Sequence, residues 1–352
     1  MKKKKIIFVF IGQSTFVTKG IQILQKDYHV APFNFGMGAK WKVPFRFFSQ
    51  FFFLLFRLPA ASLVVIQLGG FHSLLPALMS RLLGKPSLII AAGTDCHSFP
   101  SIGYGNFQKK FLGLFTRWSF KMCTHISPKD ESLWYSEYDY AEGNPSRQGI
   151  AAFLPGFSKP YSVIANGYDP EKFNRSAGGR TNTFITIAGG MDFPFQQKLK
   201  GIDLFLEAAK QFPDYQFAIV GVDSPSAFDN ISKNVRLIPP AGHDEIVRYL
   251  GDSTFYLQLS MAEGFPNALC EAMLCECVPV GSNVFSIPAI IGNNGFILKH
   301  RDGEELHSLL NAAIKNGTRE MGINARKSIA ERFPIQLRDE KLRALAGRLI
   351  ND

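Results

Sequence analysis

Residues 260–281 read SMAEGFPNALCEAMLCECVPVG, and residues 256–259 before them, YLQL, are predicted to form a buried strand. Residues 263–266, Glu-Gly-Phe-Pro, predict a turn. After it, Asn267 is expected to cap a helix running to residue 274. A glycine-bearing loop that opens a helix presents free N–H groups and the positive end of the helix dipole. The segment therefore predicts a diphosphate site, with Glu271 one turn into the helix and able to reach sugar hydroxyls.

Short buried runs alternate with helical stretches along the whole chain. Strands are expected at residues 6–11, 62–68, 87–92, 122–126, 184–188, 216–220, 256–259 and 278–281. Helices are expected between them, for example at residues 74–83 and 106–120. This alternation predicts an α/β protein with parallel sheets covered on both faces, whose ligands bind beyond the carboxyl ends of the strands.

A polar, glycine-rich stretch interrupts the alternation at residues 166–182. We therefore expect a first Rossmann-like domain over residues 1–165, a linker over 166–182, and a second Rossmann-like domain over 183–352. The length of 352 residues suits two such doubly wound domains that face each other across a cleft.

The net charge of +10 is concentrated in the first half of the chain. Residues 1–159 contain 19 basic and 7 acidic residues. A basic half suits an anionic partner such as nucleic acid, a phosphorylated acceptor or an acidic membrane leaflet. The five cysteines are odd in number and irregularly spaced, which indicates reduced, buried thiols and a cytoplasmic location.

Two apolar segments bear on membrane association. The lysines at residues 2–5 and the run 6–11 imitate a signal peptide, but the run is short and lacks a cleavage site, so we interpret it as the first strand. Residues 40–59 read KWKVPFRFFSQFFFLLFRLP, too short an apolar run to span a bilayer. This segment predicts either a helix lying in the interface of an anionic membrane or a core-facing helix with solvated basic ends.

Several segments together resemble retaining glycosyltransferases of family 4. Residues 260–281 resemble the E-x7-E motif of that family, with Glu263 and Glu271 as its two acids. The other matching segments are NGYD at residues 166–169, Lys200-Gly201, and residues 286–296. The resemblance covers most of residues 160–300 and implies the GT-B fold. It also implies that the first domain is the acceptor side and that the second domain binds the nucleotide-sugar.

The resemblance also implies roles for individual residues. Glu271 would hold the donor ribose, Glu263 would contact hydroxyls of the transferred sugar, and Lys200 would neutralise the diphosphate. The backbone expected to frame the sugar and phosphates is that of Gly264, Phe265, Pro266 and Asn267.

The sequence departs from the family pattern at three places. The family pairs its lysine with an arginine just after the preceding strand, whereas this chain has residues 189–192, GGMD, and only Lys198 nearby. In place of the family's first-domain histidine, residues 91–97 read AAGTDCH, so either Asp95 or His97 could reach the sugar. Gly12 stands where the family has a Gly-Gly loop, and it either lines the cleft or only ends the first strand.

We predict a retaining glycosyltransferase that moves a hexose from a nucleotide-sugar to a glycan or lipid-linked acceptor in cell-surface polysaccharide or lipopolysaccharide assembly. It is expected on the cytoplasmic face of the membrane, with no nucleic-acid partner. No cofactor or metal is expected, because the sequence contains no Asp-x-Asp. The alternatives are a sugar-nucleotide epimerase of the same fold and a non-catalytic relative that binds nucleotides or glycans.

Overall fold

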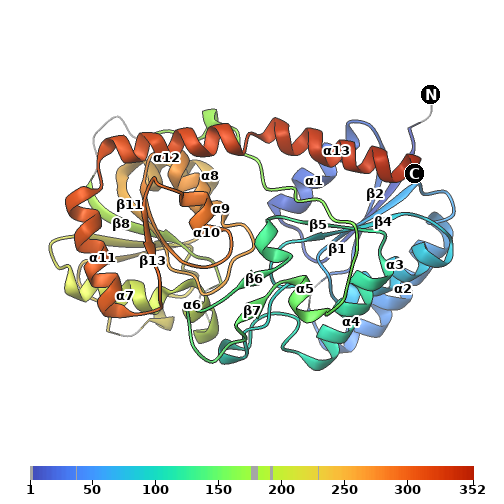
Figure 1. Cartoon of the computed structure of the whole chain (residues 1–352), viewed down its shortest axis with the longest axis horizontal. Helices are drawn as coiled ribbons and strands as arrows, with labels where there is room; N and C mark the ends of the chain where they lie inside the picture. The colour runs from blue at the N-terminus through green and yellow to red at the C-terminus, as the bar shows by residue number, and fades with distance from the viewer. Residues whose placement is uncertain (1–2, 37, 176–180, 191–192, 229) are drawn as a thin grey trace.

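Two parallel β-sheets form the centres of two α/β units that lie side by side in the computed structural model (Figure 1). The structure describes residues 3–36, 38–175, 181–190, 193–228 and 230–352. The strand order is β2-β1-β3-β4-β5 in the first sheet and β10-β9-β8-β11-β12-β13 in the second. Helices cover both faces of each sheet, so the predicted pair of Rossmann-like units is confirmed.

The first unit contains the elements numbered up to α5. Its strands are β1 (Lys5–Phe10), β2 (His29–Asn34), β3 (Leu63–Gln67), β4 (Ser87–Ala91), β5 (His125–Pro128), β6 (Ser136–Glu137) and β7 (Arg147–Gln148). Its helices are α1 (Thr15–Gln25), α2 (Val43–Arg57), α3 (Phe71–Leu82), α4 (Lys110–Met122) and α5 (Ile150–Phe153). The strand predicted at residues 122–126 begins later, because α4 continues to Met122.

The remaining elements begin at residue 181. The strands are β8 (Thr181–Ile187), β9 (Gln216–Val220), β10 (Val235–Ile238), β11 (Ser253–Gln258), β12 (Val278–Ser282) and β13 (Phe296–Leu298). The helices are α6 (Pro194–Lys200), α7 (Ile202–Gln211), α8 (His243–Asp252), α9 (Asn267–Leu274), α10 (Ile287–Ile291), α11 (Gly303–Asn316), α12 (Arg319–Arg332) and α13 (Ile335–Asn351).

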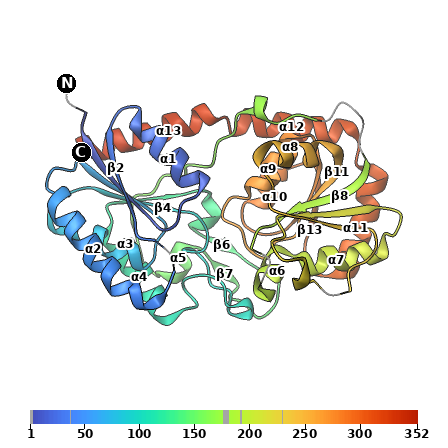
Figure 2. The ribbon, with the colours of Figure 1, turned by 180° about the vertical axis from the view of Figure 1, so that it is seen from behind.

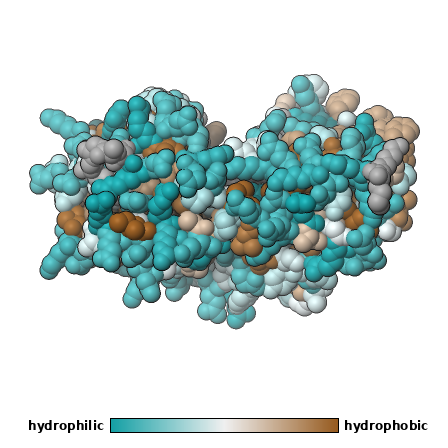
Figure 3. All heavy atoms as spheres, turned by 90° about the horizontal axis from the view of Figure 1, so that it is seen from above, coloured by the Kyte–Doolittle hydropathy of each residue, from teal (hydrophilic) through white to brown (hydrophobic). Residues whose placement is uncertain are grey.

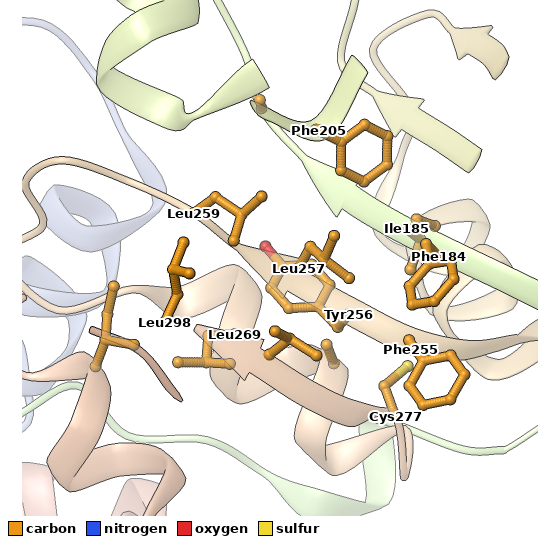
Figure 4. Packing of buried hydrophobic residues seen from close by; sticks show 14 of the residues in the cluster. Phe184, Ile185, Phe205, Phe255, Tyr256, Leu257, Leu259, Leu269, Cys277 and Leu298 are labelled. Atoms are coloured by element: carbon orange, nitrogen blue, oxygen red, sulfur yellow. The ribbon is translucent and has the colours of Figure 1, made fainter. Parts of the chain in front are cut away.

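Aromatic rings pack the second sheet against its helices. The Phe184 ring stacks on the Phe217 ring, with centroids 5.0 Å apart. It also stacks on the Phe255 ring, with centroids 4.8 Å apart (Figure 4). Phe205, from α7, meets the Phe217 ring edge-on. This packing holds β8 and β11 rigidly together, and both strands end at the cleft.

The last helix, α13, packs on the first sheet although it follows the second unit in sequence (Figures 1 and 2). Leu342 and Leu345 are buried in one cluster with Ile6 and Phe8 of β1. The predicted boundaries place residues 183–352 together, so this packing differs from what they imply. The physical reason is that the apolar side of α13 covers a face of the first sheet.

The chain crosses between the units twice at one place. The Tyr168 N–H donates to the Phe333 carbonyl, and the Ile335 N–H donates to the Tyr168 carbonyl, at 2.9 and 2.8 Å. A Cβ at Gly167 would lie 2.8 Å from the Cα of Ile335, so only glycine allows this approach. The two crossings therefore form a single hydrogen-bonded connection.

Helix α2 has one packed side and one exposed apolar side. Its Gln50 is fully buried and donates to the His72 carbonyl at 2.8 Å, and Leu54 is buried beside it. On the other side Phe45, Phe48 and Phe56 are 66–75% exposed. The helix thus has features of both alternatives predicted for residues 40–59.

The structure also shows the polarity of one surface and the state of the cysteines. The face along which α12 and α13 run is hydrophilic over most of its area (Figure 3). Among the described residues, no helix combines the length and the apolar character needed to cross a bilayer. All five cysteines are buried free thiols, as predicted.

Candidate active site

The loop between β11 and α9 begins the site. The predicted helix over residues 267–274 is confirmed, but its cap differs: Pro266 occupies the N-cap position and Asn267 is the first helical residue. The Asn267 Oδ1 accepts hydrogen bonds from Asn166 Nδ2 and Tyr168 Oη, at 3.0 and 2.6 Å. Asn267 therefore attaches the helix to the first crossing of the chain instead of capping it.

Glu263 is the centre of a hydrogen-bonded group in this loop. Its Oε1 accepts from Lys200 Nζ at 2.6 Å, from Ser260 Oγ at 2.9 Å and from Gln258 Nε2 at 3.2 Å. The Gln258 Oε1 in turn accepts from Tyr256 Oη at 3.0 Å. We call Lys200, Glu263, Gln258 and Ser260 the paired side of the cleft.

A close backbone approach places Lys200 beside Glu263. Gly201 has a φ of +69°, and a Cβ there would lie 2.1 Å from the Leu259 carbonyl oxygen. The Met261 N–H donates to the Leu199 carbonyl at 2.8 Å. Because only glycine tolerates both the contact and the left-handed φ, Gly201 is a structural requirement of this arrangement.

The same loop touches the first unit through Gly264. A Cβ at Gly264 would lie 1.7 Å from the Ala92 carbonyl oxygen, just after β4. A Cβ at Gly93 would in turn lie 3.1 Å from the Gly264 Cα. The two units therefore meet backbone to backbone at the edge of the cleft.

A cavity of about 520 Å³ lies between the units and collects most of the predicted site residues. Glu263, Lys200, Glu271 and the whole segment from Gly264 to Asn267 line it. Its charged lining residues are Lys19, Lys129, Lys200, Glu263, Glu271 and Arg338. The basic side chains outnumber the acidic ones, so the cavity suits an anionic ligand.

Glu271 faces the cavity from α9. Burial raises the pKa of its carboxyl to about 7, and the Lys19 charge acts in the opposite direction. Burial also lowers the pKa of Lys19 itself. Near neutral pH the Glu271 carboxyl is therefore present in both its charged and its uncharged form. Either form can hydrogen-bond a ligand that carries hydroxyl groups.

Two further cations line the cavity and were not predicted from the sequence. Lys129 follows β5 directly and is 4% exposed, while Arg338 lies on α13 and is 5% exposed. Burial, and secondly the Arg338 charge, lower the pKa of Lys129 well below its usual range. We call Lys129 and Arg338 the unpaired side of the cleft, because neither forms an ion pair with a described residue.

Asp95 and His97 are buried away from this lining. The Asp95 carboxylate accepts backbone N–H groups from Gly69 at 2.8 Å and from Ala92 and Gly93 at 3.1 Å, and burial raises its pKa. It faces a separate cavity of about 410 Å³. Among the described residues that line the cavity of Glu263, neither Asp95 nor His97 occurs.

His97 packs between the two units. Its ring lies 4.1 Å from the Phe285 ring, centroid to centroid, and its two ring nitrogens have no hydrogen-bond partner among the described residues. Burial lowers the pKa of this histidine to about 3, so it is uncharged at neutral pH.

Gly12 and Lys198 occupy peripheral positions. Gly12 has a φ of +70° and donates its N–H to Asn34 Oδ1 at 3.2 Å, which is the strand-end turn expected as one alternative. Its neighbours Ile11 and Ser14, not Gly12 itself, line the cavity. Lys198 is exposed on α6 and does not line the cavity. Of the predicted GGMD segment, residues 191–192 lie outside the described residues.

The described residues contain no cluster of three His, Cys, Asp or Glu side chains that could hold a metal ion. The cations that face the cavity are side chains of Lys and Arg.

The chain is similar in sequence to known glycosyltransferases. Residues 196–331 match the sequence family described as "Glycosyl transferases group 1". The chain is 29% identical over 266 residues to trehalose synthase of Thermococcus litoralis, an alignment that covers 68% of this chain and 60% of that protein. It is 29% identical over 172 residues to one component of human phosphatidylinositol N-acetylglucosaminyltransferase, an alignment that covers 45% of this chain and 34% of that protein.

The fold has solved relatives as well. The structure of Anabaena HepE with UDP-glucose superposes with a TM-score of 0.70 at 14% identity, and the superposition covers 97% of this chain and 99% of that one. The chain spans between about a third and three fifths of the length of the curated relatives it matches. The structural likeness therefore establishes the fold, and residues 196–331 are similar in sequence to the glycosyl transferases group 1 family.

Proposed function

We propose that this chain, whose residues 196–331 match the glycosyl transferases group 1 family and which has the GT-B fold, is a retaining hexosyltransferase of family 4. Its donor would be a nucleotide-diphosphate sugar bound in the cavity of about 520 Å³. One observation carries the proposal: Glu263 and Lys200 form a 2.6 Å ion pair in the same cavity as Glu271 and the start of α9.

The arrangement supplies what glycosyl transfer needs. Glu271 would hold the ribose, and Glu263 would hold hydroxyls of the transferred sugar. Lys200 would neutralise the diphosphate, and the N-terminus of α9 offers it free N–H groups. In this proposal each of these groups would contact the donor directly.

The reaction would proceed on one face of the sugar. The acceptor oxygen bonds to the anomeric carbon on the side from which the diphosphate leaves. The bond between the anomeric carbon and the phosphate oxygen breaks, and its electron pair stays on the diphosphate. That phosphate oxygen takes the acceptor proton, so no separate strong base is needed. Lys200 stabilises the charge that develops on the leaving group.

Slow hydrolysis of the donor tests this mechanism without knowledge of the acceptor. With an α-linked nucleotide-hexose, time-resolved NMR should first detect the α anomer of the free hexose, because water replaces the acceptor on the same face. The first appearance of the β anomer would contradict retention. Conversion of the donor to an epimer with its nucleotide still attached would favour the epimerase alternative.

The known relatives support this donor and acceptor chemistry. HepE was solved with UDP-glucose, and the human relative is named for N-acetylglucosaminyl transfer to phosphatidylinositol. Both names are compatible with a nucleotide-hexose donor, and the second with a lipid acceptor. On this basis we propose a glycan or lipid-linked acceptor in cell-surface polysaccharide assembly.

We also propose that α2, α3 and α4 dock on an anionic membrane surface. Between residues 28 and 129 the only acidic residue is Asp95, which is buried. The three helices lie side by side on the first unit, with basic residues such as Arg57, Arg81 and Lys121 on them (Figures 1 and 2). A surface without acidic residues is complementary to anionic lipid.

Exposed apolar side chains lie on the same helices. They are Trp41, Phe45, Phe48, Phe51, Phe52, Leu55 and Phe56 at α2, Phe71, Leu78 and Leu82 on α3, and Phe111, Leu114 and Trp118 on α4. Rings and cations on one surface are the features of proteins that lie in the membrane interface. Docking by this surface would bring the first unit close to a lipid-linked acceptor.

Co-sedimentation with liposomes of rising anionic content tests the docking. Binding should increase with anionic lipid and weaken at high salt. It should fall in Phe48→Ser with Phe56→Ser, and when Lys40, Lys42 and Arg46 are all replaced by Gln. Phe193→Ser is the control, because Phe193 is 58% exposed but belongs to the second unit. Absence of binding to strongly anionic liposomes at low salt would refute the docking.

A further inference from the structure

Two buried cations of the cleft form no ion pair with any described residue. Lys129 and Arg338 are each at least 95% buried, and both line the cavity that holds Glu263. The Arg338 Nε has no hydrogen-bond partner among the described residues. Burying a charge without a partner is costly, and burial accordingly lowers the pKa of Lys129, so a bound anion would favour the charged form of this side chain.

Lys129 and Arg338 reach the cavity from different segments of the chain. Arg338 lies at the crossing of the chain, where a Cβ at Gly167 would be 3.1 Å from the Arg338 Cβ. Lys129 ends β5 of the first sheet, and its N–H donates to the Ala91 carbonyl. The N-terminus of α1, capped by Ser14, lines the same cavity and adds a second helix dipole. Three separate segments thus present positive charge to one space.

The paired side cannot neutralise a diphosphate alone. Lys200 is the only cation in the group around Glu263, and its ammonium already lies 2.6 Å from that carboxylate. Lys198 is exposed and does not line the cavity. A diphosphate in this cavity therefore needs cations from another part of the chain.

We infer that Lys129 and Arg338 form a second phosphate-binding element that contacts the donor diphosphate from the side of the first unit, opposite Lys200. This inference rests on the proposed function. Glu271 indicates which part of the donor lies here, because Glu271 and Arg338 line the same cavity. The ribose expected at Glu271 is covalently joined to the diphosphate, so a phosphate near Arg338 is that of the donor and not of the acceptor.

Calorimetric titration of the full chain tests this element. The probes are UDP, inorganic pyrophosphate, uridine and sn-glycerol 3-phosphate. Lys129→Met and Arg338→Met should each weaken UDP and pyrophosphate binding by about 10- to 100-fold, the value of one hydrogen bond to a charged group. Uridine binding should stay within about twofold, because uridine has no phosphate. Arg338→Lys should restore part of the lost affinity, since it keeps the charge.

Thermal unfolding shows whether the variants remain folded. Removing a buried, unpaired cation should leave the Tm of the ligand-free protein unchanged or higher, while the increase produced by UDP becomes smaller. A purely structural role would lower the Tm of the ligand-free protein and leave the increase on UDP addition intact, and that result would overturn the inference. Lys198→Met, an exposed lysine of α6, is the matched control and should behave as the unmodified protein.

The outcomes separate this inference from the proposed function. If Lys200→Met weakens UDP binding but Lys129→Met and Arg338→Met do not, the second element is wrong and the donor site stands. If the unmodified protein binds neither UDP nor pyrophosphate, both are wrong. If the two variants lose glycerol 3-phosphate binding but keep UDP binding, the cations serve the acceptor phosphate and the assignment to the donor is overturned.

Discussion

The two sides of the cleft hold their charges in opposite ways. On the paired side, the Lys200 ammonium, the Ser260 hydroxyl and the Gln258 amide all donate to one oxygen of Glu263. On the unpaired side, Lys129 and Arg338 are buried without a described carboxylate partner. The paired side is complete without a ligand, whereas the unpaired side becomes complete only when an anion binds. The contrast indicates where binding energy for a diphosphate is available.

The largest expected effect comes from breaking the paired side. Lys200→Ala should lower kcat/KM by about 2–4 kcal/mol in transition-state stabilisation, because it removes a positioned charge from the leaving group and leaves Glu263 without its cation. Steady-state kinetics with the true donor measure this loss. Lys198→Ala, two residues away on α6, should change kcat/KM by less than about twofold. The reverse result would show that the phosphate lysine is misplaced by two residues.

A smaller effect concerns Glu271 and stability. Burial raises the folded-state pKa of this carboxyl from 4.5 to about 7, so the folded protein binds more protons than the unfolded chain between these values. Its stability therefore falls as pH rises from 4.5 to about 7 and stays reduced above that. Glu271→Gln should stabilise the ligand-free protein by about 2–3 kcal/mol at pH 8 and by roughly 1 kcal/mol at pH 5.

Urea unfolding at the two pH values checks this prediction, while calorimetry should show weaker nucleotide binding by Glu271→Gln. Glu340→Gln, at an exposed position of α13, is the control and should show no gain that depends on pH. Equal stability changes at pH 5 and pH 8 would refute the raised pKa of Glu271.

The contact between the two units is tested by a substitution at Gly264. Gly264→Ala places a Cβ where the Ala92 carbonyl oxygen lies, 1.7 Å away, so the loop of the paired side must shift. We expect a loss of about 1–3 kcal/mol in folding stability, as for other overpacked positions, together with a fall in kcat/KM. Gly347→Ala is the control, because a Cβ there meets Tyr28 Oη at an ordinary 3.5 Å. Unchanged activity of Gly264→Ala would show that this contact does not position the site.

The smallest expected effect is that of chelation. If Lys200, Lys129 and Arg338 together neutralise the diphosphate, a divalent ion is not needed for that purpose. Initial rates should therefore change by less than about twofold after dialysis against EDTA. A loss of activity that added Mg²⁺ or Mn²⁺ restores would contradict the neutralisation by side chains.

The two sides also differ in how far the sequence reveals them. Residues 256–274 are contiguous, and a strand, a glycine turn and a helix at this spacing have a recognisable pattern. The sequence can therefore single out Glu263, residues 264–267 and Glu271, all of which line the cavity. Lys129 and Arg338 are 209 positions apart in the numbering and meet only through the fold. Each on its own resembles an ordinary surface cation.

Parts of the fold were unpredictable for the same reason. The strands that end at the cleft were predicted within a few residues, because their buried apolar runs are local signals. The packing of α13 on β1 depends on residues more than 300 positions apart, so no local sequence pattern predicts it. Likewise, three backbone N–H groups donate to the buried Asp95 carboxylate, and the buried His97 ring lies beside Phe285. Both arrangements follow from tertiary contacts that the sequence does not show, so the sequence alone favours a role near the sugar for either residue.

A thermal-shift titration with a panel of sugar nucleotides tests the central claim most directly, because a ligand that binds only the folded state raises the Tm by mass action. We predict that one nucleotide-hexose raises the Tm with saturation, and that Lys200→Ala and Glu271→Gln each reduce this increase while Lys198→Ala does not. If no member of the panel raises the Tm, or if the increase is unaffected by Lys200→Ala and Glu271→Gln, the cleft between the two units is not the donor site.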